Sequence, residues 1–378
     1  MCWFICSSSA SLCFVPKACF PTKSMALEKP DQGEDVMNHK LSIPFFGLLM
    51  IAAAFAVGQT MEDLRLPVTI GLIYLTVVVG MHAFIGMTGI MSFGHVGFMA
   101  IGAYTSAILS MSPNRKMIFL ANLPEVLKDI TLPSYAAALV GGCAALAVAA
   151  FTGRTFMRLS KLNVSIATLL VLMIIQSVLR NSDGVTGASG LLPGVVRSVT
   201  LGTSAVTAVL AILAVWAFQT SRVGFKIRSA RQDPLAAAAV GLDVEKGQRI
   251  AYYFSAFIVG IGGAQYAHFV GSLSPNFFYF STTGILLGML VIGGIGTLSG
   301  AIVGTFLVTA ILELLRRIEP GLDLGLVHLP SVAGLREFGL SFLFLLILIR
   351  WPRGLMNGSE VNIKPIGVLE KKAEPKHA

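Results

Sequence analysis

Residues Ser221–Ile250 read SRVGFKIRSARQDPLAAAAVGLDVEKGQRI and form the longest polar interruption in an otherwise almost continuously apolar chain. Six Lys or Arg residues stand against three Asp or Glu residues there, which gives a net charge of +3. Between the charges lies Pro234–Val240, which is rich in alanine and is followed by Gly241. Asp233 can cap a helix that starts with proline, and glycine commonly follows a helix end. The stretch therefore predicts a short capped helix whose small side chains allow close approach of a partner.

The composition places most of the remaining chain in a membrane. Of 378 residues, 55% are hydrophobic and 12% are charged, whereas a soluble domain carries about 25% charged residues. No soluble core could bury so much apolar sequence, so lipid must be the solvent for most of it. The net charge of +9 lies mainly in loops beside apolar runs, which is typical of membrane topology and gives no reason to expect a nucleic-acid partner. The predicted fold class is an all-α, polytopic helical membrane protein.

Ten apolar runs approach the length of about 20 residues that a helix needs to cross the hydrocarbon core of a membrane. The third and the eighth are rich in glycine and could be broken or tilted helices, so eight to ten spans are expected. The runs are Leu41–Gln59, Leu66–Ile85, Phe93–Ser110, Leu132–Phe151, Leu162–Leu179, Thr203–Phe218, Ile250–Val270, Thr283–Ile295, Ala301–Leu315 and Phe338–Ile349.

Lys and Arg residues in the short loops predict the orientation of these spans, because such residues concentrate on the cytoplasmic side. With Arg222–Arg249 placed inside, the basic loop at 154–161 and both chain termini also lie inside. The longer connections Met111–Thr131 and Asn181–Gly202 then lie outside. The basic pair at 316–317 falls at the outer face, against the general rule.

The two ends of the chain differ from the apolar region between them. Four of the five cysteines fall within the first 19 residues, without His or acidic residues at the spacing of metal ligands. A metal site or disulfides would be one interpretation, and a true translation start at Met25 or Met37 is the other. We expect residues 1–36 to be a non-native or disordered extension, 37–355 to be the membrane domain, and 356–378 to be a disordered cytoplasmic tail.

The first glycine-rich stretch is Gly86–Tyr104, GMTGIMSFGHVGFMAIGAY. Gly94, Gly97 and Gly102 permit either close helix crossings or a break in a helix. His95 is an ionisable residue at the mouth of a predicted span, which makes it a candidate functional group. The alternative is that its ring simply reaches the water at the membrane interface.

The second glycine-rich stretch is Gly284–Gly304, GILLGMLVIGGIGTLSGAIVG. Gly296, Gly300 and Gly304 are four residues apart and would line one helical face, a surface that favours tight association. The pair at 293–294, together with Gly296, favours a turn between two spans. We interpret this stretch as packing within the bundle or between subunits.

A third stretch, Asp183–Gly194, has the sequence DGVTGASGLLPG and predicts an exposed loop on the outer side. A substrate or a donor protein would arrive there. A plain flexible connector explains the composition equally well.

Catalytic motifs are missing from the sequence. It contains no phosphate-binding GxxxxGK[ST], no G-x-S-x-G, no HExxH and no Cys-x-x-Cys. Glu313 is the one acid well inside an apolar run, with Arg316 one turn further on, which offers little for a carboxylate relay. If the chain moves a solute uphill, the energy comes from another chain, so no enzymatic activity is expected of this one.

Four stretches together resemble one family. They are SFGHVGFMAIGAYTSAIL (Ser92–Leu109), TGASGLLPG (Thr186–Gly194), SRVGFKIRSARQDPLAAAAVGLDV (Ser221–Val244) and GGIGTLSGAIVG (Gly293–Gly304). The chain resembles the permease subunits of ABC importers for branched-chain amino acids, the LivM-type and related LivH-type membrane proteins. With the hydropathy pattern, the resemblance covers about residues 40 to 355.

The resemblance implies a permease architecture like that of vitamin B12 and ribose importers, in the bacterial inner membrane. It implies as partners a second homologous permease, two ABC ATPase subunits and a periplasmic substrate-binding protein. ATP and magnesium would be bound by the ATPases, and this chain would bind no cofactor of its own. Leucine, isoleucine or valine is the implied cargo. Urea, short amides or other amino acids are alternatives, as are a secondary carrier without ATPases and a purely structural subunit.

The resemblance also assigns candidate roles to residues. For coupling to the ATPase these are Gly224, Arg228, Arg231, Asp233, Ala236, Ala237 and Gly241. For the pore or for packing they are Ser92, Gly94, His95, Gly97, Gly102, Tyr104, Gly293, Gly294, Gly296 and Gly300, and for the outer loop they are Thr186, Gly187 and Gly190.

Overall fold

The computed structural model describes residues 32–120, 123–182, 190–319, 334–351, 354–356 and 360. The chain divides into two compact units, Met1–Asn38 and His39–Ala378. The second unit contains the helical bundle.

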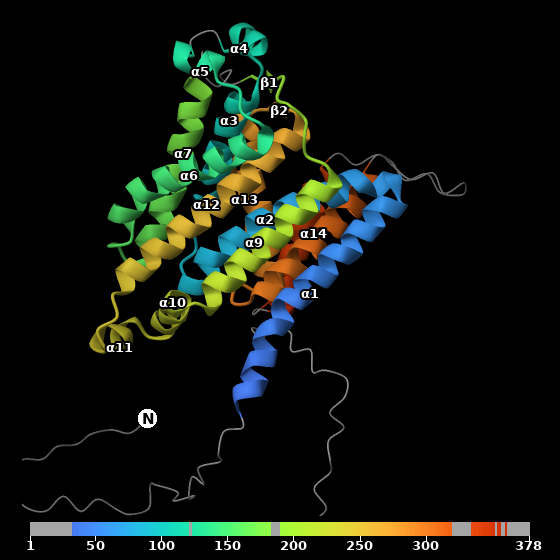
Figure 1. The fold of residues 1–378 in the computed structure, drawn as a ribbon. Helices are drawn as coiled ribbons and strands as arrows, with labels where there is room; N and C mark the ends of the chain where they lie inside the picture. The colour runs from blue at the N-terminus through green and yellow to red at the C-terminus, as the bar shows by residue number, and fades with distance from the viewer. Residues whose placement is uncertain are drawn as a thin grey trace, which may run out of the picture. The chain divides into compact units, whose positions relative to one another are not determined.

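Long helices lie side by side through this unit, with short elements at their ends (Figure 1). In chain order the elements are α1 (Gln32–Thr60), α2 (Glu62–Thr88), α3 (His95–Ser110), α4 (Pro113–Phe119), α5 (Glu125–Asp129), α6 (Ser134–Phe156), α7 (Lys161–Asn181), β1 (Leu192–Pro193), α9 (Leu201–Thr220), α10 (Arg222–Gln232), α11 (Pro234–Ala239), α12 (Val244–Val270), β2 (Ser272–Leu273), the 3-10 helix η1 (Pro275–Phe278), α13 (Phe280–Gly293), α14 (Leu298–Ile318) and α15 (Leu335–Arg350).

Each of the ten predicted apolar runs forms a helix, which confirms the all-α, polytopic membrane class. Seven helices within the described residues are long and apolar enough to cross a membrane. The other three predicted spans correspond to α3, α12 and α15. The apolar part of α15 (Phe338–Ile347) and the whole of α3 are shorter than a full span, whereas α12 has 27 residues and begins in the polar loop.

The centre of the bundle is built on α2 and α12. Nearly every residue of α2 from Leu72 to Thr88 is buried, as expected for a helix that is apolar all round. α12 packs against α2, α3 and α6. Outward-facing residues of α6, α7 and α9 include exposed large hydrophobic side chains such as Phe151, Leu162 and Val206, which suits surfaces that face lipid.

Glycines allow backbone contact between α3 and three other helices, α6, α7 and α12. A Cβ added at Gly102 of α3 would overlap the carbonyl of Gly260 on α12. A Cβ at Gly141 of α6 would lie 2.6 Å from the Gly102 oxygen, and one at Gly94 would lie 2.5 Å from the Thr168 oxygen. Within this chain, the first glycine-rich stretch therefore serves close helix crossings, as one of its two interpretations held.

The second glycine-rich stretch forms the α13–α14 hairpin, and here one expectation is wrong. Gly296 lies in the turn before α14 and does not line a helical face. The physical reason is local. The hydroxyl of Thr297 accepts a hydrogen bond of 3.2 Å from the Gly300 amide and so caps the helix that begins at Leu298. Cβ atoms at Gly293 and Gly304 would overlap the facing backbone, so these two glycines do pack the hairpin tightly.

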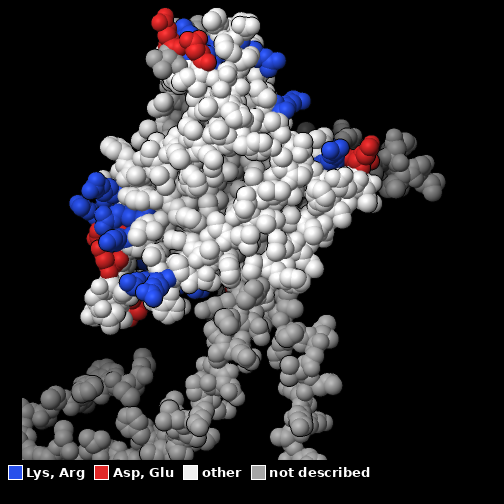
Figure 2. Space-filling model, viewed as in Figure 1, with Lys and Arg blue, Asp and Glu red and all other residues white. Residues whose placement is uncertain are grey.

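The connections predicted to share the outer side lie together at one end of the bundle. β1 and β2 pair antiparallel with Leu192 opposite Leu273, and the Arg115 guanidinium donates to the Gly194 carbonyl at 3.0 Å. α10 and α11 lie at the other end (Figure 1). Figure 2 shows a wide uncharged belt between these ends, with the coloured charged side chains gathered toward them.

Candidate functional site: the α10–α11 surface and its anchors

The short helix α11 has the local structure that its sequence predicts. The carboxylate of Asp233 accepts hydrogen bonds from the backbone amides of Leu235 at 2.9 Å and Ala236 at 3.0 Å. These bonds satisfy two of the amides that every helix start leaves without a partner. After the helix, Gly241 has a φ of +79°, a left-handed conformation that glycine adopts without strain.

Most of α11 is uncovered. Leu235 is 83% exposed and Val240 is 75% exposed, and Ala236, Ala238 and Ala239 are exposed as well. Within the described part of the chain, no neighbouring atom lies within 4 Å of the position that a Cβ would take at Gly241. Large apolar side chains at such exposure, next to small ones and at the charged end of a membrane protein, form a surface suited to a protein partner. In contrast, Ala237 is buried and holds α11 to the bundle.

α10 fixes the position of this surface. Its buried residues Gly224, Ile227 and Ala230 are three apart and so lie on one face. That face packs toward α2 and α12. A Cβ at Gly224 would overlap the Phe218 carbonyl at the end of α9, so glycine permits the sharp passage from α9 into α10. The hydroxyl of Ser221 caps α10 by accepting a hydrogen bond of 3.1 Å from the Gly224 amide.

Two arginines tie α10 to the transmembrane helices. Arg228 donates to the Gln219 carbonyl at 3.0 Å, and Arg231 donates to the Gly86 carbonyl on α2. Hydrogen bonds of charged donors are among the stronger ones. The two bonds connect α10 to α2 and to the end of α9. The local sequence indicated membrane topology for both cations and the family resemblance assigned them to coupling, but neither predicted these contacts.

Glu360 is an anchor at this end that the sequence did not reveal. Its carboxylate accepts hydrogen bonds from the amides of Leu298 at 2.9 Å and Ser299 at 3.2 Å, and from the Ser299 hydroxyl at 2.6 Å. A carboxylate at a helix start is stabilising, because it meets unpaired amides and the positive end of the helix dipole. Gln219 also donates to Glu360, at 3.4 Å, which links α9 to α14.

The chain after α15 is also bonded to the bundle upstream of Glu360. The amide of Leu355 donates to the Ile292 carbonyl at 2.9 Å, and that of Met356 donates to the Gly293 carbonyl at 3.2 Å. The expectation of a disordered tail from residue 356 is therefore wrong for Met356 and Glu360. The rest of that tail lies outside the described residues.

His95 is enclosed by the protein. It has no exposed surface, its Nδ1 lies 2.8 Å from the Ser92 hydroxyl, and the rings of Phe84, Phe98 and Tyr252 lie within 6 Å of its centre. The interpretation that it reaches interfacial water is therefore wrong, because aromatic side chains from α2, α3 and α12 surround it.

The remaining candidates fall in different places. Tyr104 is buried and its ring meets Phe278 edge-on at 6.2 Å. Gly97 faces Ile175 of α7. Gly294 ends α13 with a φ of +123°. In the outer loop, Gly190 is exposed, whereas Thr186 and Gly187 lie outside the described residues.

A bundle of apolar helices with a short, capped and exposed helix between two of them is the architecture of a multi-pass membrane protein. Comparison with known proteins agrees with this class. Residues 67–348 match the family described as the branched-chain amino acid transport system / permease component, and the chain belongs to that family. The resemblance seen in the sequence is thereby confirmed.

Two relatives carry the name high-affinity branched-chain amino acid transport system permease protein LivM. The relative from Escherichia coli (strain K12) is 23% identical over 314 residues, which is 74% of this chain and 69% of the relative. The relative from Salmonella typhimurium (strain LT2) is 23% identical over 313 residues, which is 73% of this chain and 69% of the relative. No solved structure gives a significant match.

Proposed function

We propose that this chain is the membrane-spanning subunit of an ATP-driven importer of branched-chain amino acids. Its family and the names of its relatives support the transport of such amino acids. The observation that supports an ATP-driven mechanism is the exposed α11 surface, held by Asp233 and Gly241 and carried by an anchored α10.

The proposed complex contains a second homologous permease, two ABC ATPase subunits and a periplasmic binding protein. ATP and magnesium belong to the ATPases. The end with α10 and α11 faces the cytoplasm of a bacterium, as do both chain termini, and the end with β1 and β2 receives the binding protein.

In this mechanism α11 docks into a groove on one ATPase. When ATP closes the ATPase pair, the groove displaces α11 and α10 together, since Ala237 and the buried face of α10 leave little freedom between them and the bundle. Arg231 and Arg228 pass the displacement to α2 and α9. The bundle then opens toward the binding protein, and ATP hydrolysis resets it.

The test is Leu235→Glu in the complete complex, reconstituted in proteoliposomes with its binding protein. Leu235 is 83% exposed, so the variant should fold normally. A carboxylate buried in the contact between α11 and the ATPase should abolish both leucine uptake and the stimulation of ATP hydrolysis by leucine. Leu235→Met and the neighbouring exposed Gln232→Glu are the controls, and both should transport. Full coupling in Leu235→Glu would refute the docking role of α11.

Substitutions at Ala237 or Gly241 would test docking less clearly, because each would also change the folding or the backbone of this segment. Ala237 is buried, so a charge there would disturb folding as well as docking. Gly241 has a positive φ, so most side chains there would add backbone strain to any effect on the partner.

A further inference from the structure

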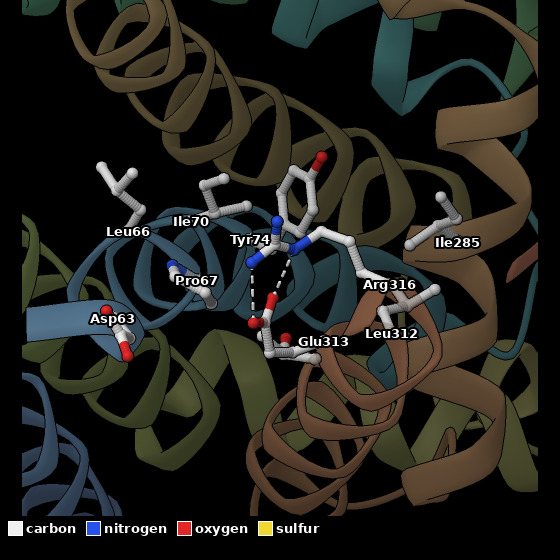
Figure 3. Close-up of a pocket in the computed structure, with 10 residues that line it drawn as sticks. Asp63, Leu66, Pro67, Ile70, Tyr74, Ile285, Leu312, Glu313 and Arg316 are labelled. Atoms are coloured by element: carbon white, nitrogen blue, oxygen red, sulfur yellow. Dashed lines mark hydrogen bonds and ion pairs between the residues drawn. The ribbon is translucent and has the colours of Figure 1, made fainter. Parts of the chain in front are cut away.

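A cavity of about 360 Å³ lies between α2, α13 and α14. The first turn of α2 and the last turn of α14 line it, so it is at the end opposite α11. Most of its lining residues are apolar, and Figure 3 shows Asp63 apart from the paired Arg316 and Glu313. Its lining includes Asp63, Leu66, Ile70, Ile285, Leu312 and Arg316.

The charged residues at the cavity form a net positive cluster around Glu313 and a separate carboxylate, Asp63. Glu313, with a side chain 11% exposed, accepts two bonds of 2.8 Å from Arg316 and one of 2.9 Å from Arg317. Two guanidinium groups against one carboxylate leave one positive charge. These bonds of Arg316 use Nε and Nη2, and Nη1 has no acceptor among the described residues. Asp63 makes no ion pair with any described residue.

The cavity continues along α13. A second cavity, of about 580 Å³, shares Ile285 and Leu312 with the first and reaches Met91 and Phe93 in the segment between α2 and α3. Gly284 lines this second cavity, and no atom of the described residues lies within 4 Å of the position that its Cβ would take. One exposed face of α13 therefore borders both cavities.

We propose that the cavity at Asp63 and Arg316 receives the amino acid in its zwitterionic form on its way along α13. Arg316 binds the α-carboxylate and Asp63 binds the α-ammonium group, while Ile70, Ile285 and Leu312 contact the branched side chain. The volume agrees with that of small-molecule sites, which is about 300–1,000 Å³, as does an apolar lining with few polar groups. This assignment rests on the proposed function and names the place where the substrate is bound.

The charge pattern distinguishes this occupant from others. A lipid acyl chain carries no charge, so it would give neither Arg316 nor Asp63 an ionic partner beyond the Arg316–Glu313 pair. A side chain of a second permease would need no open path beside Gly284. A zwitterion with an apolar side chain uses all three features.

The experiment places a cysteine at Gly284 in the full complex in lipid nanodiscs, with the five native cysteines changed to serine and the binding protein omitted. The rate of reaction with a small water-soluble thiol reagent is measured with and without leucine. Leucine at about twice its dissociation constant should slow the reaction roughly threefold. A cysteine at Leu191, which is 56% exposed near β1, is the control and should react at an unchanged rate.

Two further arms test the zwitterion. 3-Methylbutylamine lacks the carboxylate and 4-methylpentanoate lacks the ammonium group, so neither should protect at the same concentration. Asp63→Asn should weaken protection by leucine roughly tenfold, since it removes one charged hydrogen bond.

The outcomes separate this proposal from the proposed function. If the complex with its binding protein takes up leucine but leucine gives no protection at Gly284→Cys, the cavity assignment is wrong and the function stands. Equal protection by the two analogues, or a cysteine that never reacts because lipid or the second permease covers it, would also overturn the assignment. If the complex takes up no branched-chain amino acid, the proposed function itself fails.

Discussion

The crossing of α3, α6 and α12 and the α10–α11 segment both depend on small residues, but they use them in opposite ways. At the crossing, a methyl group at Gly102 or Gly141 would overlap a backbone carbonyl, and one at Gly260 would overlap the Cβ of Ala145. On α11, Ala236 is exposed, and no described atom fills the space beside Gly241, which follows this helix. Among the described residues, the space beside small residues is thus filled in one region and left open in the other. Composition alone cannot distinguish the two uses.

The largest effect is expected at the crossing. Gly102→Ala should force α3 away from α12 and lower the free energy of unfolding by roughly 3 kcal/mol, since only backbone atoms oppose the new methyl group. Thermal unfolding of the protein in detergent, followed by size-exclusion chromatography, would measure this. Gly202→Ala is the control, because its Cβ would meet only the Thr200 hydroxyl, at 3.9 Å. Equal stability of the two variants would show that α3 and α12 can move apart at this crossing without loss of stability.

An intermediate effect is expected at the anchor of the α10–α11 end. Glu360→Gln replaces an ionised acceptor of three bonds at the start of α14, which should cost about 2 kcal/mol locally. Hydrogen exchange at the Leu298 and Ser299 amides should become faster in the variant. The exposed Glu245→Gln should leave these amides unchanged. Unaltered exchange in Glu360→Gln would mean that the carboxylate does not hold α14.

The smallest effect is expected at the cap of α11. Asp233→Ala removes the acceptor for the Leu235 and Ala236 amides and should destabilise this short helix by about 1 kcal/mol. Faster hydrogen exchange confined to α11, with a modest loss of transport, is the expected pattern. Asp243→Ala removes the cap of α12 instead and should affect only the start of that helix. Unchanged exchange in α11 would show that docking to the bundle, and not the cap, sets its conformation.

Much of the architecture was predictable from the sequence because it depends on local properties. The length and apolarity of a run determine whether it forms a membrane helix, and all ten predicted runs are helical. Asp233, Pro234 and Gly241 determine α11 through bonds and dihedral angles within a few residues of each other. The same logic placed a turn at Gly293–Gly296.

Contacts between distant residues were decided only by the tertiary structure. Arg231 and Gly86 are 145 residues apart, and Glu360 and Ser299 are 61 apart. Neither sequence neighbourhood predicts its partner, because a single charged residue in a loop or tail has no periodicity to read. The enclosure of His95 and the meeting of Asp63 with Arg316 at one cavity likewise depend on how helices far apart in the chain pack. Local chemistry therefore determined the helices and the exposed α11, whereas packing determined what those helices bring together.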